Sequence, residues 1–181
     1  MEDLSLHILD VVENAIRAHA QRISIMITED IQHDQLAIEI KDNGTGMSEK
    51  LRKKALDPFT TTKTSSRIGL GLPLFEQAAR MSDGEFSLSS ETNLGTTVCA
   101  TFKHSHVDRK PMGNIAQTIL TLIAGNPAIN FIYTHTKQGV TYSLDTNEWK
   151  KELDGIPINH PEVLRLIREE LAEQLVKIGV T

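Results

Sequence analysis

The chain has 181 residues, 39% of them hydrophobic and 24% charged, as expected of one large globular domain or of one domain with a smaller companion. Its net charge of -5 gives no basic excess for nucleic-acid binding, and its single cysteine excludes an intrachain disulfide, which favours a reducing, cytoplasmic setting. The chain contains no run of roughly 20 apolar residues, so no membrane span is predicted. The acidic start MEDLSL does not resemble a secretory signal.

The first hundred residues predict alternating helices and strands. Apolar residues at helical spacing, from Leu4 to Ile16, give an opening helix with one apolar stripe. Residues 22–28 and 35–42 alternate apolar and polar side chains, which predicts two strands joined by a polar turn. The expected elements that follow are a short helix over 48–56, a loop over 57–69, a helix over 70–81, and strands over 85–91 and 96–103.

The chain changes character after residue 103. The polar segment 104–113 contains a proline and a glycine and is interpreted as a boundary. We therefore predict one domain over residues 1–103 and a small α/β domain over 104–181, for which no motif indicates a role. The elements expected beyond the boundary are a helix over 115–125, two strands within 129–145, a short helix over 147–153 and an amphipathic helix over 161–179.

Four short motifs occur in order over about ninety residues of the first part. They are ENAIRA on the opening helix, DNGTGM after a strand, PFTTTK followed by GLGL at a helix start, and LGTTV entering a strand. Any one of them alone is more often an ordinary turn or surface segment. In this order and spacing they resemble the N, G1, lid, G2 and G3 boxes of the GHKL ATPase superfamily, which includes gyrase, Hsp90, histidine kinases and MutL.

This resemblance implies a fold and a ligand. The fold would be α+β, a two-layer α/β sandwich of the Bergerat type with a mixed, mostly antiparallel sheet, followed here by a small C-terminal α/β extension. The ligand would be ATP with Mg²⁺, held by residues 1–103 as a histidine kinase-like ATP-binding domain. The segment PFTTTK is close to the lid of many histidine kinases and differs from the lids of Hsp90 and gyrase.

The resemblance places adenine at DNGTGM. Asp42 would accept a hydrogen bond from the adenine amino group, a task that suits an ionised carboxylate because it only accepts. Gly44 and Gly46 would let the backbone pass close under the base, and Met47 would offer it an apolar, polarisable surface. Thr97 resembles the threonine that supports both the adenine and Asp42.

The phosphates would lie between two helices. Asn14 resembles the family's magnesium ligand, and Mg²⁺ accepts one side-chain oxygen beside phosphates and water. Arg17, one turn later, matches a position where histidine kinases often carry a basic residue that meets phosphates. Gly69, Leu70 and Gly71 open a helix, whose unpaired N–H groups and dipole attract anions. The lid would close over the phosphates with Thr60, Thr61, Thr62 and Lys63.

The residue that activates water for hydrolysis is left open between two carboxylates. Gyrase-like and MutL-like relatives carry a glutamate one turn before the magnesium asparagine, whereas this chain carries Asp10 there. Asp10 shares a helix face with Asn14 and could orient water, although aspartate is one methylene shorter. Glu13 points about a quarter turn away and ranks second. The alternative is that Asp10 only hydrogen-bonds Arg17 or His7.

Three functions fit these residues. The first is a Mg²⁺-dependent slow ATPase whose lid drives a switch. The second is a stand-alone protein kinase acting on a histidine, serine or threonine of a separate partner, because the chain opens on the N-box helix without the phosphoacceptor hairpin of a sensor kinase. The third is a nucleotide sensor that hydrolyses nothing.

Further expectations concern partners and additional ligands. Beside ATP we expect a protein partner, no nucleic acid and no membrane, and the sequence leaves a homodimer open. Lys110 and Lys137 are candidates, on position alone, for a lysine that reaches the phosphates. His104 and His106 form an H-x-H pair of a metal-binding kind, without an evident third ligand.

Overall fold

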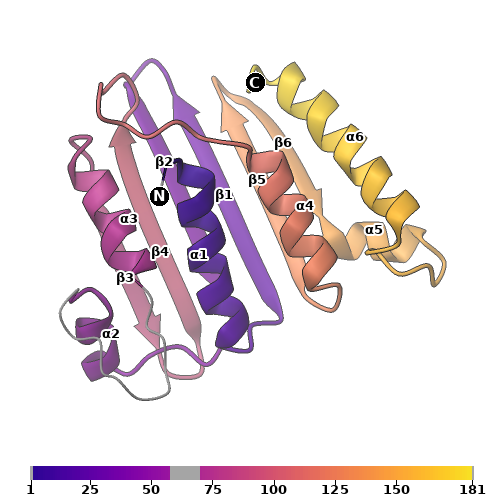
Figure 1. Ribbon diagram of the computed structural model, residues 1–181, viewed down its shortest axis with the longest axis horizontal. Coiled ribbons are helices and arrows are strands. Elements are labelled where there is room, and N and C mark those ends of the chain that lie inside the picture. Colours follow the sequence, from indigo (N-terminus) through magenta and orange to yellow (C-terminus); the bar gives the residue numbers. More distant parts are fainter. Residues whose placement is uncertain (1, 58–69, 181) are drawn as a thin grey trace.

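A computed structural model describes residues 2–57 and 70–180 of the chain (Figure 1). The helices are α1 (Leu4–Arg17), α2 (Glu49–Ala55), α3 (Gly71–Arg80), α4 (Ile115–Gly125), α5 (Thr146–Glu152) and α6 (Pro161–Lys177). The strands are β1 (Arg22–Asp30), β2 (Gln35–Asp42), β3 (Phe86–Glu91), β4 (Gly95–Lys103), β5 (Asn130–Lys137) and β6 (Val140–Asp145). The predicted α+β class is confirmed, and each expected helix and strand is present with bounds that move by one or two residues.

The six described strands form one sheet in the order β3-β4-β2-β1-β5-β6. Four of its strand pairs are antiparallel. The remaining pair, β1 with β5, is parallel over eight residues, from Arg22 opposite Asn130 to Glu29 opposite Lys137. The sheet is therefore mixed and mostly antiparallel, as the resemblance implied.

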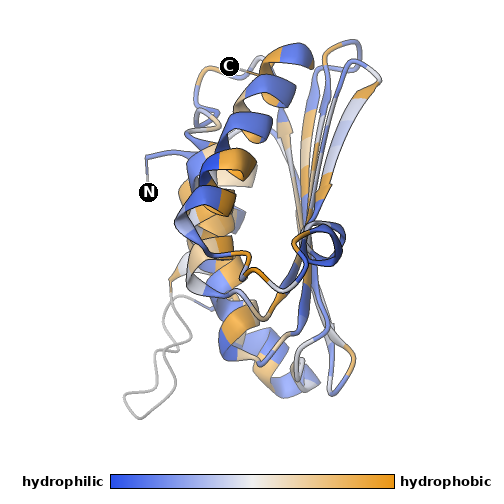
Figure 2. Ribbon diagram, turned by 90° about the vertical axis from the view of Figure 1, so that its right-hand side faces the viewer, coloured by the Kyte–Doolittle hydropathy of each residue, from blue (hydrophilic) through white to orange (hydrophobic). Residues whose placement is uncertain are grey.

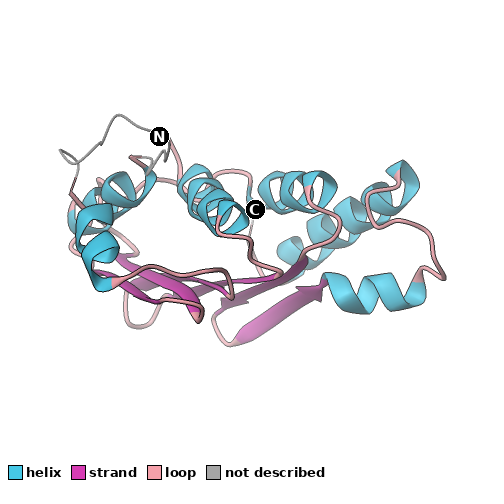
Figure 3. Ribbon diagram, turned by 90° about the horizontal axis from the view of Figure 1, so that it is seen from below, coloured by secondary structure: helices cyan, strands magenta, loops and turns pink. Residues whose placement is uncertain are grey.

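The helices α1, α3, α4 and α6 cover one face of the sheet, so the described part of the molecule has two layers (Figures 2 and 3). Period-two alternation in β1 and β2 explains this, since one side of each strand is apolar and buried and the other is more exposed. Asp3 caps α1 by accepting a hydrogen bond from the Leu6 amide at 3.0 Å. In the described part of the chain, no helix has the length and apolar character needed to cross a membrane.

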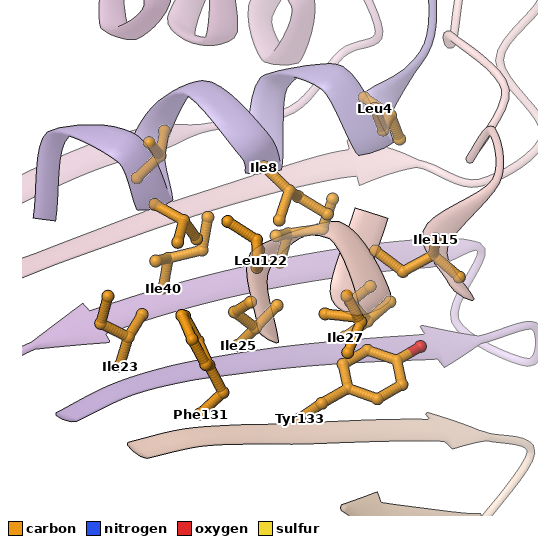
Figure 4. Close-up of a cluster of buried hydrophobic side chains, with 14 of the residues drawn as sticks. Leu4, Ile8, Ile23, Ile25, Ile27, Ile40, Ile115, Leu122, Phe131 and Tyr133 are labelled. Carbon is orange, nitrogen blue, oxygen red and sulfur yellow. The ribbon is translucent and has the colours of Figure 1, made fainter. Parts of the chain in front are cut away.

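Both parts of the chain contribute to one apolar core (Figure 4). Ile8 of α1 and Ile25 of β1 pack in the same cluster as Leu122 of α4 and Phe131 of β5, and all four are at most 3% exposed. The strands of the second part extend the first sheet at β1 instead of forming another. The domain boundary at residue 103 remains a prediction. In the structure, the segments before and after it share one sheet and one core.

A buried polar network holds the parallel strand pair together at the end of β1. The Glu29 carboxylate, 8% exposed, accepts hydrogen bonds from His135 at 2.9 Å and from His104 at 3.1 Å. The Lys137 ammonium lies 3.5 Å from it, and the Tyr133 hydroxyl lies 2.7 Å from the other ring nitrogen of His135. Burial alone would raise the pKa of Glu29, but the hydrogen bonds from His135 and His104 and the charges of Lys137 and His135 together outweigh burial and lower it to about 2.

Candidate functional site

The motifs of the first part meet at the end of the sheet opposite Glu29. Asp42 is the last residue of β2, and it lies directly across from Ile23 at the start of β1 and from Thr96 at the start of β4. Glu29 and Asp42 are therefore separated by about six residues along the strands, or roughly 20 Å. The loop that follows Asp42 approaches α1 at Ala18, where the Thr45 amide donates to the Ala18 carbonyl at 2.8 Å.

Asp42 is a buried carboxylate, 8% exposed, that faces the helical layer with Ile38 and Ile40. Its Oδ1 accepts a hydrogen bond from the Gly44 amide at 2.7 Å. Burial raises the pKa of Asp42, and the backbone amides of Gly44 and Thr96 only partly counter that rise. Among residues 2–57 and 70–180 no basic side chain pairs with it, so its charge is held by neutral donors in a site of low polarity.

The glycines of this loop are required by its close packing. A Cβ at Gly44 would lie 2.6 Å from the Ala18 carbonyl oxygen. Gly46 has a φ of +62°, and a Cβ there would lie 2.0 Å from the Glu91 carbonyl oxygen. Since such distances are far below van der Waals contact, the loop can pass between α1 and the β3–β4 turn only with glycine at both positions.

Two residues that we did not single out from the sequence position the loop. The Asn43 side chain accepts hydrogen bonds from the amides of Gln21 and Arg22, both at 2.9 Å, and so fastens the loop to the start of β1. The Ser90 hydroxyl of β3 accepts from the Met47 amide at 2.8 Å and lies 2.9 Å from the Thr96 hydroxyl. The motif DNG contained a signal for Asn43, because Asn side chains commonly bond nearby backbone, but nothing in the sequence pointed to Ser90.

The predicted threonine of LGTTV needs a correction of one position. Thr97 pairs with Lys41 in the register of β4 with β2, on the face of the sheet away from the helices. Thr96 lies directly opposite Asp42, and directly opposed residues of antiparallel strands share a face. The threonine beside Asp42 is therefore Thr96, and Thr97 is on the wrong side of the sheet to reach it.

Asp10 of α1 lies against the first residue of α3. A Cβ at Gly71 would lie 3.0 Å from the Asp10 carboxylate oxygen Oδ2, so the start of α3 lies in tight contact with this side chain. Burial raises the pKa of Asp10, the neighbouring Glu13 charge adds to the rise, and Arg17 opposes it. The start of α3 thus brings N–H groups and a raised-pKa carboxylate together, the combination expected at an anion site with a proton acceptor.

Glu13, Arg17 and Asn14 form a cluster on the last turn of α1. Arg17 donates to Glu13 at 2.8 Å and to the Asn14 side-chain oxygen at 3.2 Å. In the part of the chain described, no hydrogen bond joins Asp10 to Arg17 or to His7, although the charge of Arg17 acts on Asp10. His7 is buried and stacks on Phe75 at 5.2 Å, and burial lowers the pKa of His7 to about 4.

Several predicted residues are placed elsewhere or lie outside the structure. Met47 packs partly buried against the core, and Leu70 precedes α3 with 54% of its surface exposed. Lys137 lies at the opposite end of the sheet, beside Glu29, whereas the charge of Lys110 acts on His7, near the start of α1. The predicted residues outside the described ranges are Thr60, Thr61, Thr62, Lys63 and Gly69.

The H-x-H pair does not form a metal site. His104 faces Glu29, whereas His106 lies 3.5 Å from Asp83. Across residues 2–57 and 70–180, no group of three or more acidic, histidine or cysteine side chains is arranged to hold a metal ion. The half-buried Asn14 side chain offers an oxygen of the kind that Mg²⁺ accepts.

Comparison with known proteins finds relatives for the part of the chain that carries these motifs. The family model described as "Histidine kinase-, DNA gyrase B-, and HSP90-like ATPase" matches residues 2–106. The signal transduction histidine-protein kinase AtoS of Escherichia coli (strain K12) is 38% identical over 91 residues, which are 50% of this chain and 15% of that protein. Sporulation kinase E of Bacillus subtilis (strain 168) is 33% identical over 89 residues, 49% of this chain and 12% of that protein.

The chain spans less than a third of the length of these curated relatives. A crystal structure of the N-terminal domain of a DNA repair protein is similar with a TM-score of 0.57 and 19% identity, covering 80% of this chain and 53% of that chain. A coverage of 80% exceeds the share occupied by residues 2–106, so the likeness in fold reaches into the C-terminal part.

Proposed function

Because the chain belongs to the family of histidine kinase-, DNA gyrase B- and HSP90-like ATPases, it binds ATP, and we propose that it does so with Mg²⁺ and hydrolyses the nucleotide slowly to drive a switch. The observation that carries this proposal is Asp42. A buried carboxylate without a basic partner in the described residues is costly to the fold. A donor supplied by a ligand, such as an adenine amino group, would satisfy it.

Adenine recognition falls to the loop after β2. Asp42 keeps acceptor capacity beyond its bond to Gly44, and Asn43 and Ser90 hold the loop that carries Gly44, Gly46 and Met47. In this proposal Thr96 takes the supporting role first given to Thr97, because it shares the face of Asp42. The rigid attachment of the loop to β1 and β3 would keep the acceptor in place before the nucleotide arrives.

Phosphate binding falls to the facing ends of α1 and α3. The first amides of α3 and the Arg17 guanidinium supply positive potential. The Asn14 oxygen fits a magnesium ion, provided that its 3.2 Å bond from Arg17 is released. When bound, that ion would supply charge neutralisation to the phosphates. The lid residues Thr60 to Lys63 keep the role that the resemblance gives them.

Asp10 is the residue that we propose to orient water. Its raised pKa and its place against Gly71 suit a proton acceptor beside the phosphates. Glu13 is a weaker candidate, because it already pairs with Arg17 at 2.8 Å on an exposed surface.

A calorimetric titration with ATP and Mg²⁺, followed by a phosphate-release assay, tests this function. The matched variants are Asp10→Asn, which keeps the size of the side chain, and Asn14→Ala. We expect Asp10→Asn to bind ATP and to lose turnover, and Asn14→Ala to lose the Mg²⁺ dependence of binding. Unchanged turnover in Asp10→Asn would exclude Asp10 as the proton acceptor, and no ATP binding in the wild type would overturn the proposal.

A second candidate is a kinase that acts on a separate protein, since the curated relatives above are histidine kinases. Incubation of the pure chain and a cell extract with ATP labelled at the γ-phosphate would reveal a phosphorylated protein. Acid lability of the label would indicate phosphohistidine, and acid stability would indicate phosphoserine or phosphothreonine. An absence of ATP-dependent labelling together with steady phosphate release would favour the ATPase, and binding without either would leave a nucleotide sensor.

A further inference from the structure

The sheet has two outer strands, and the described part of the chain shields the edge of only one of them. At the β3 edge, Arg52 of α2 donates to the Leu88 carbonyl at 3.2 Å, so α2 lies against this strand. At the β6 edge, Thr141 and Ser143 are exposed, and β6 pairs with β5 alone. This second edge lies beyond residues 2–106, the part of the chain that the family model matches.

The turn between β5 and β6 indicates which backbone groups of β6 point outward. It consists of Gln138 and Gly139, both with positive φ, at +49° and +80°, as in a two-residue hairpin of type I′. Lys137 and Val140, which flank the turn, then form a hydrogen-bonded pair. Bonded and non-bonded pairs alternate from there along the two antiparallel strands.

Thr141 and Ser143 fall at the non-bonded positions of this ladder. The Thr141 hydroxyl lies 2.8 Å from the Thr136 hydroxyl, and the Ser143 hydroxyl lies 3.3 Å from the Thr134 hydroxyl, as the closer side chains of non-bonded pairs allow. The N–H and C=O groups of Thr141 and Ser143 therefore point away from β5. Among residues 2–57 and 70–180, no other strand or side chain pairs with these groups.

The β6 edge lacks the features that usually keep an exposed strand from pairing. Natural edge strands carry charged side chains, proline or a bulge. Residues 140–144 contain no charged residue and no proline, and their register with β5 runs without a bulge. An edge with free donors and acceptors and without such protection is suited to pairing with another extended backbone.

The helix α6 limits what can occupy this edge. The Tyr142 hydroxyl donates to Glu170 of α6 at 2.9 Å, so the helix lies over β6, and it extends past the strand in Figures 1 and 3. A second copy paired through its own β6 would bring a second α6 into the same space, because paired strands are about 4.8 Å apart and packed helices about 8–10 Å apart. A single extended segment needs only the space of one strand. Leu166, one turn before Glu170, is 46% exposed and offers such a segment an apolar contact.

We propose that the β6 edge binds an extended segment of a partner protein, which adds to the sheet as a further strand. The outward backbone groups of Thr141 and Ser143 supply the affinity. Side chains of the segment alternate, with apolar residues on the side of Tyr142 and short hydroxyl residues on the side of Thr141. This inference goes beyond the proposed function and needs no nucleotide, so ATP binding and segment binding succeed or fail independently.

The experiment uses the full chain and a labelled synthetic peptide of about ten residues. The peptide alternates valine and threonine and carries lysines at both ends for solubility. Two matched peptides carry N-methyl groups on every valine or on every threonine. Because the N–H groups of alternate residues point to opposite edges of a strand, only one methylated peptide can still pair with β6. We expect fluorescence anisotropy to show that one binds as the unmodified peptide does and that the other binds about tenfold more weakly.

Amide hydrogen exchange reports on the edge itself. In the free chain the amides of Thr141 and Ser143 should exchange rapidly, because they have no partner in the sheet. With the unmodified peptide bound, both amides should become protected. The Tyr142 amide, which points toward β5, is the internal control and should be protected in both states.

Two variants at one position separate backbone from side-chain recognition. Ser143→Pro removes an outward N–H and leaves the ladder with β5 in place, since proline is tolerated where the N–H of an edge strand faces solvent. It should weaken peptide binding about tenfold. Ser143→Ala keeps the N–H, loses only the hydroxyl, and should bind the peptide as the wild type does.

Four results would overturn the proposal. They are no binding of the unmodified peptide, equal binding of the two methylated peptides, full binding by Ser143→Pro, and rapid exchange at Thr141 and Ser143 in the complex. A wild-type dimer in sedimentation that Ser143→Pro abolishes would overturn it as well, since a second copy would then occupy the edge. Should Ser143→Pro fail to fold, as thermal melting would show, the methylated peptides and the exchange data decide.

Discussion

At the scale of single residues, two buried carboxylates at opposite ends of the sheet differ in their partners. Glu29 receives hydrogen bonds from His135 and His104, which together with the charges of Lys137 and His135 lower its pKa to about 2 despite burial. Asp42 meets only backbone amides among the described residues, so burial dominates and raises its pKa. Glu29 therefore stabilises the fold, whereas the charge of Asp42 opposes it, as is common for a residue kept for binding.

The first prediction is that Asp42→Asn separates binding from stability. Loss of a charge-assisted hydrogen bond, about 1.5–3 kcal/mol, should weaken ATP binding about 10-fold to 100-fold. Because the folded pKa of Asp42 is raised, ionisation disfavours the folded state at neutral pH, so the neutral variant should melt at the wild-type temperature or higher. Calorimetry and thermal melting check both parts, and an unchanged affinity for ATP would remove Asp42 from the site.

The second prediction concerns Glu29 and acid. Since the folded pKa is about 2 and the ordinary value is 4.5, the stabilisation is fully present above pH 4.5 and is lost as the pH falls toward 2. That shift corresponds to about 3 kcal/mol. Denaturant unfolding measured from pH 7 to pH 2 should show this loss in the wild type and a flatter profile in Glu29→Gln. Parallel profiles for the two proteins would contradict the role of the network.

At the scale of elements, the loop between β2 and α2 is shaped by its neighbours. Asn43 ties it to β1 and Ser90 ties it to β3. Gly46 occupies the left-handed region at the point where the loop meets the backbone of Glu91. The geometry proposed for adenine recognition thus depends on contacts from β1 and β3, and a change in the loop should affect the fold and the site together.

The third prediction compares two glycines with positive φ. Ala at either position costs about 1–2 kcal/mol of backbone strain. At Gly139, with a φ of +80°, no atom lies within 4 Å of an added Cβ, whereas at Gly46 the added Cβ would lie 2.0 Å from backbone. Gly46→Ala should therefore lose more unfolding free energy than Gly139→Ala and should also lose ATP binding. Equal losses in chemical denaturation would mean that the loop can relax away from Glu91.

At the scale of the whole molecule, α1 connects the nucleotide residues to the C-terminal part. It packs against α3 on one side and against α4 on the other (Figure 1). Its first amides donate to the linker carbonyls of Pro111 and Met112, at 2.9 and 2.8 Å. A movement of α1 toward bound phosphates would therefore be felt by residues 104–181, which is the physical route for the switch that we propose.

The fourth prediction is that a fragment of residues 1–103 does not fold cooperatively. Without residues 104–181, the β1 edge would lack its partner β5, and core residues such as Ile25 and Ile27 would be exposed. We expect the fragment to aggregate or to show rapid amide exchange in β1, while the full chain unfolds in one transition. Native-like exchange protection in the fragment would show instead that the predicted boundary is also a folding boundary.

Much of the fold and of the candidate site could be predicted from the order of residues in the sequence. The period of apolar residues located the helices and strands, and four ordered motifs indicated the candidate site that we propose for the nucleotide, with Asp10, Asn14 and Asp42. The choice between Thr96 and Thr97 could not be made in the same way. A shift of one residue in strand register moves a side chain to the other face of the sheet, and register is decided by pairing with a distant strand.

The sequence by itself determined the local elements and the chemistry of the nucleotide motifs, because helix and strand periodicity and motif spacing act over short stretches of chain. Only the tertiary structure decided that β5 pairs in parallel with β1, that Ser90 holds the loop after Asp42, and that Glu29 is satisfied by two histidines far away in sequence. These contacts join residues more than forty positions apart. No local pattern specifies them, since they form only when the shared core brings the strands together.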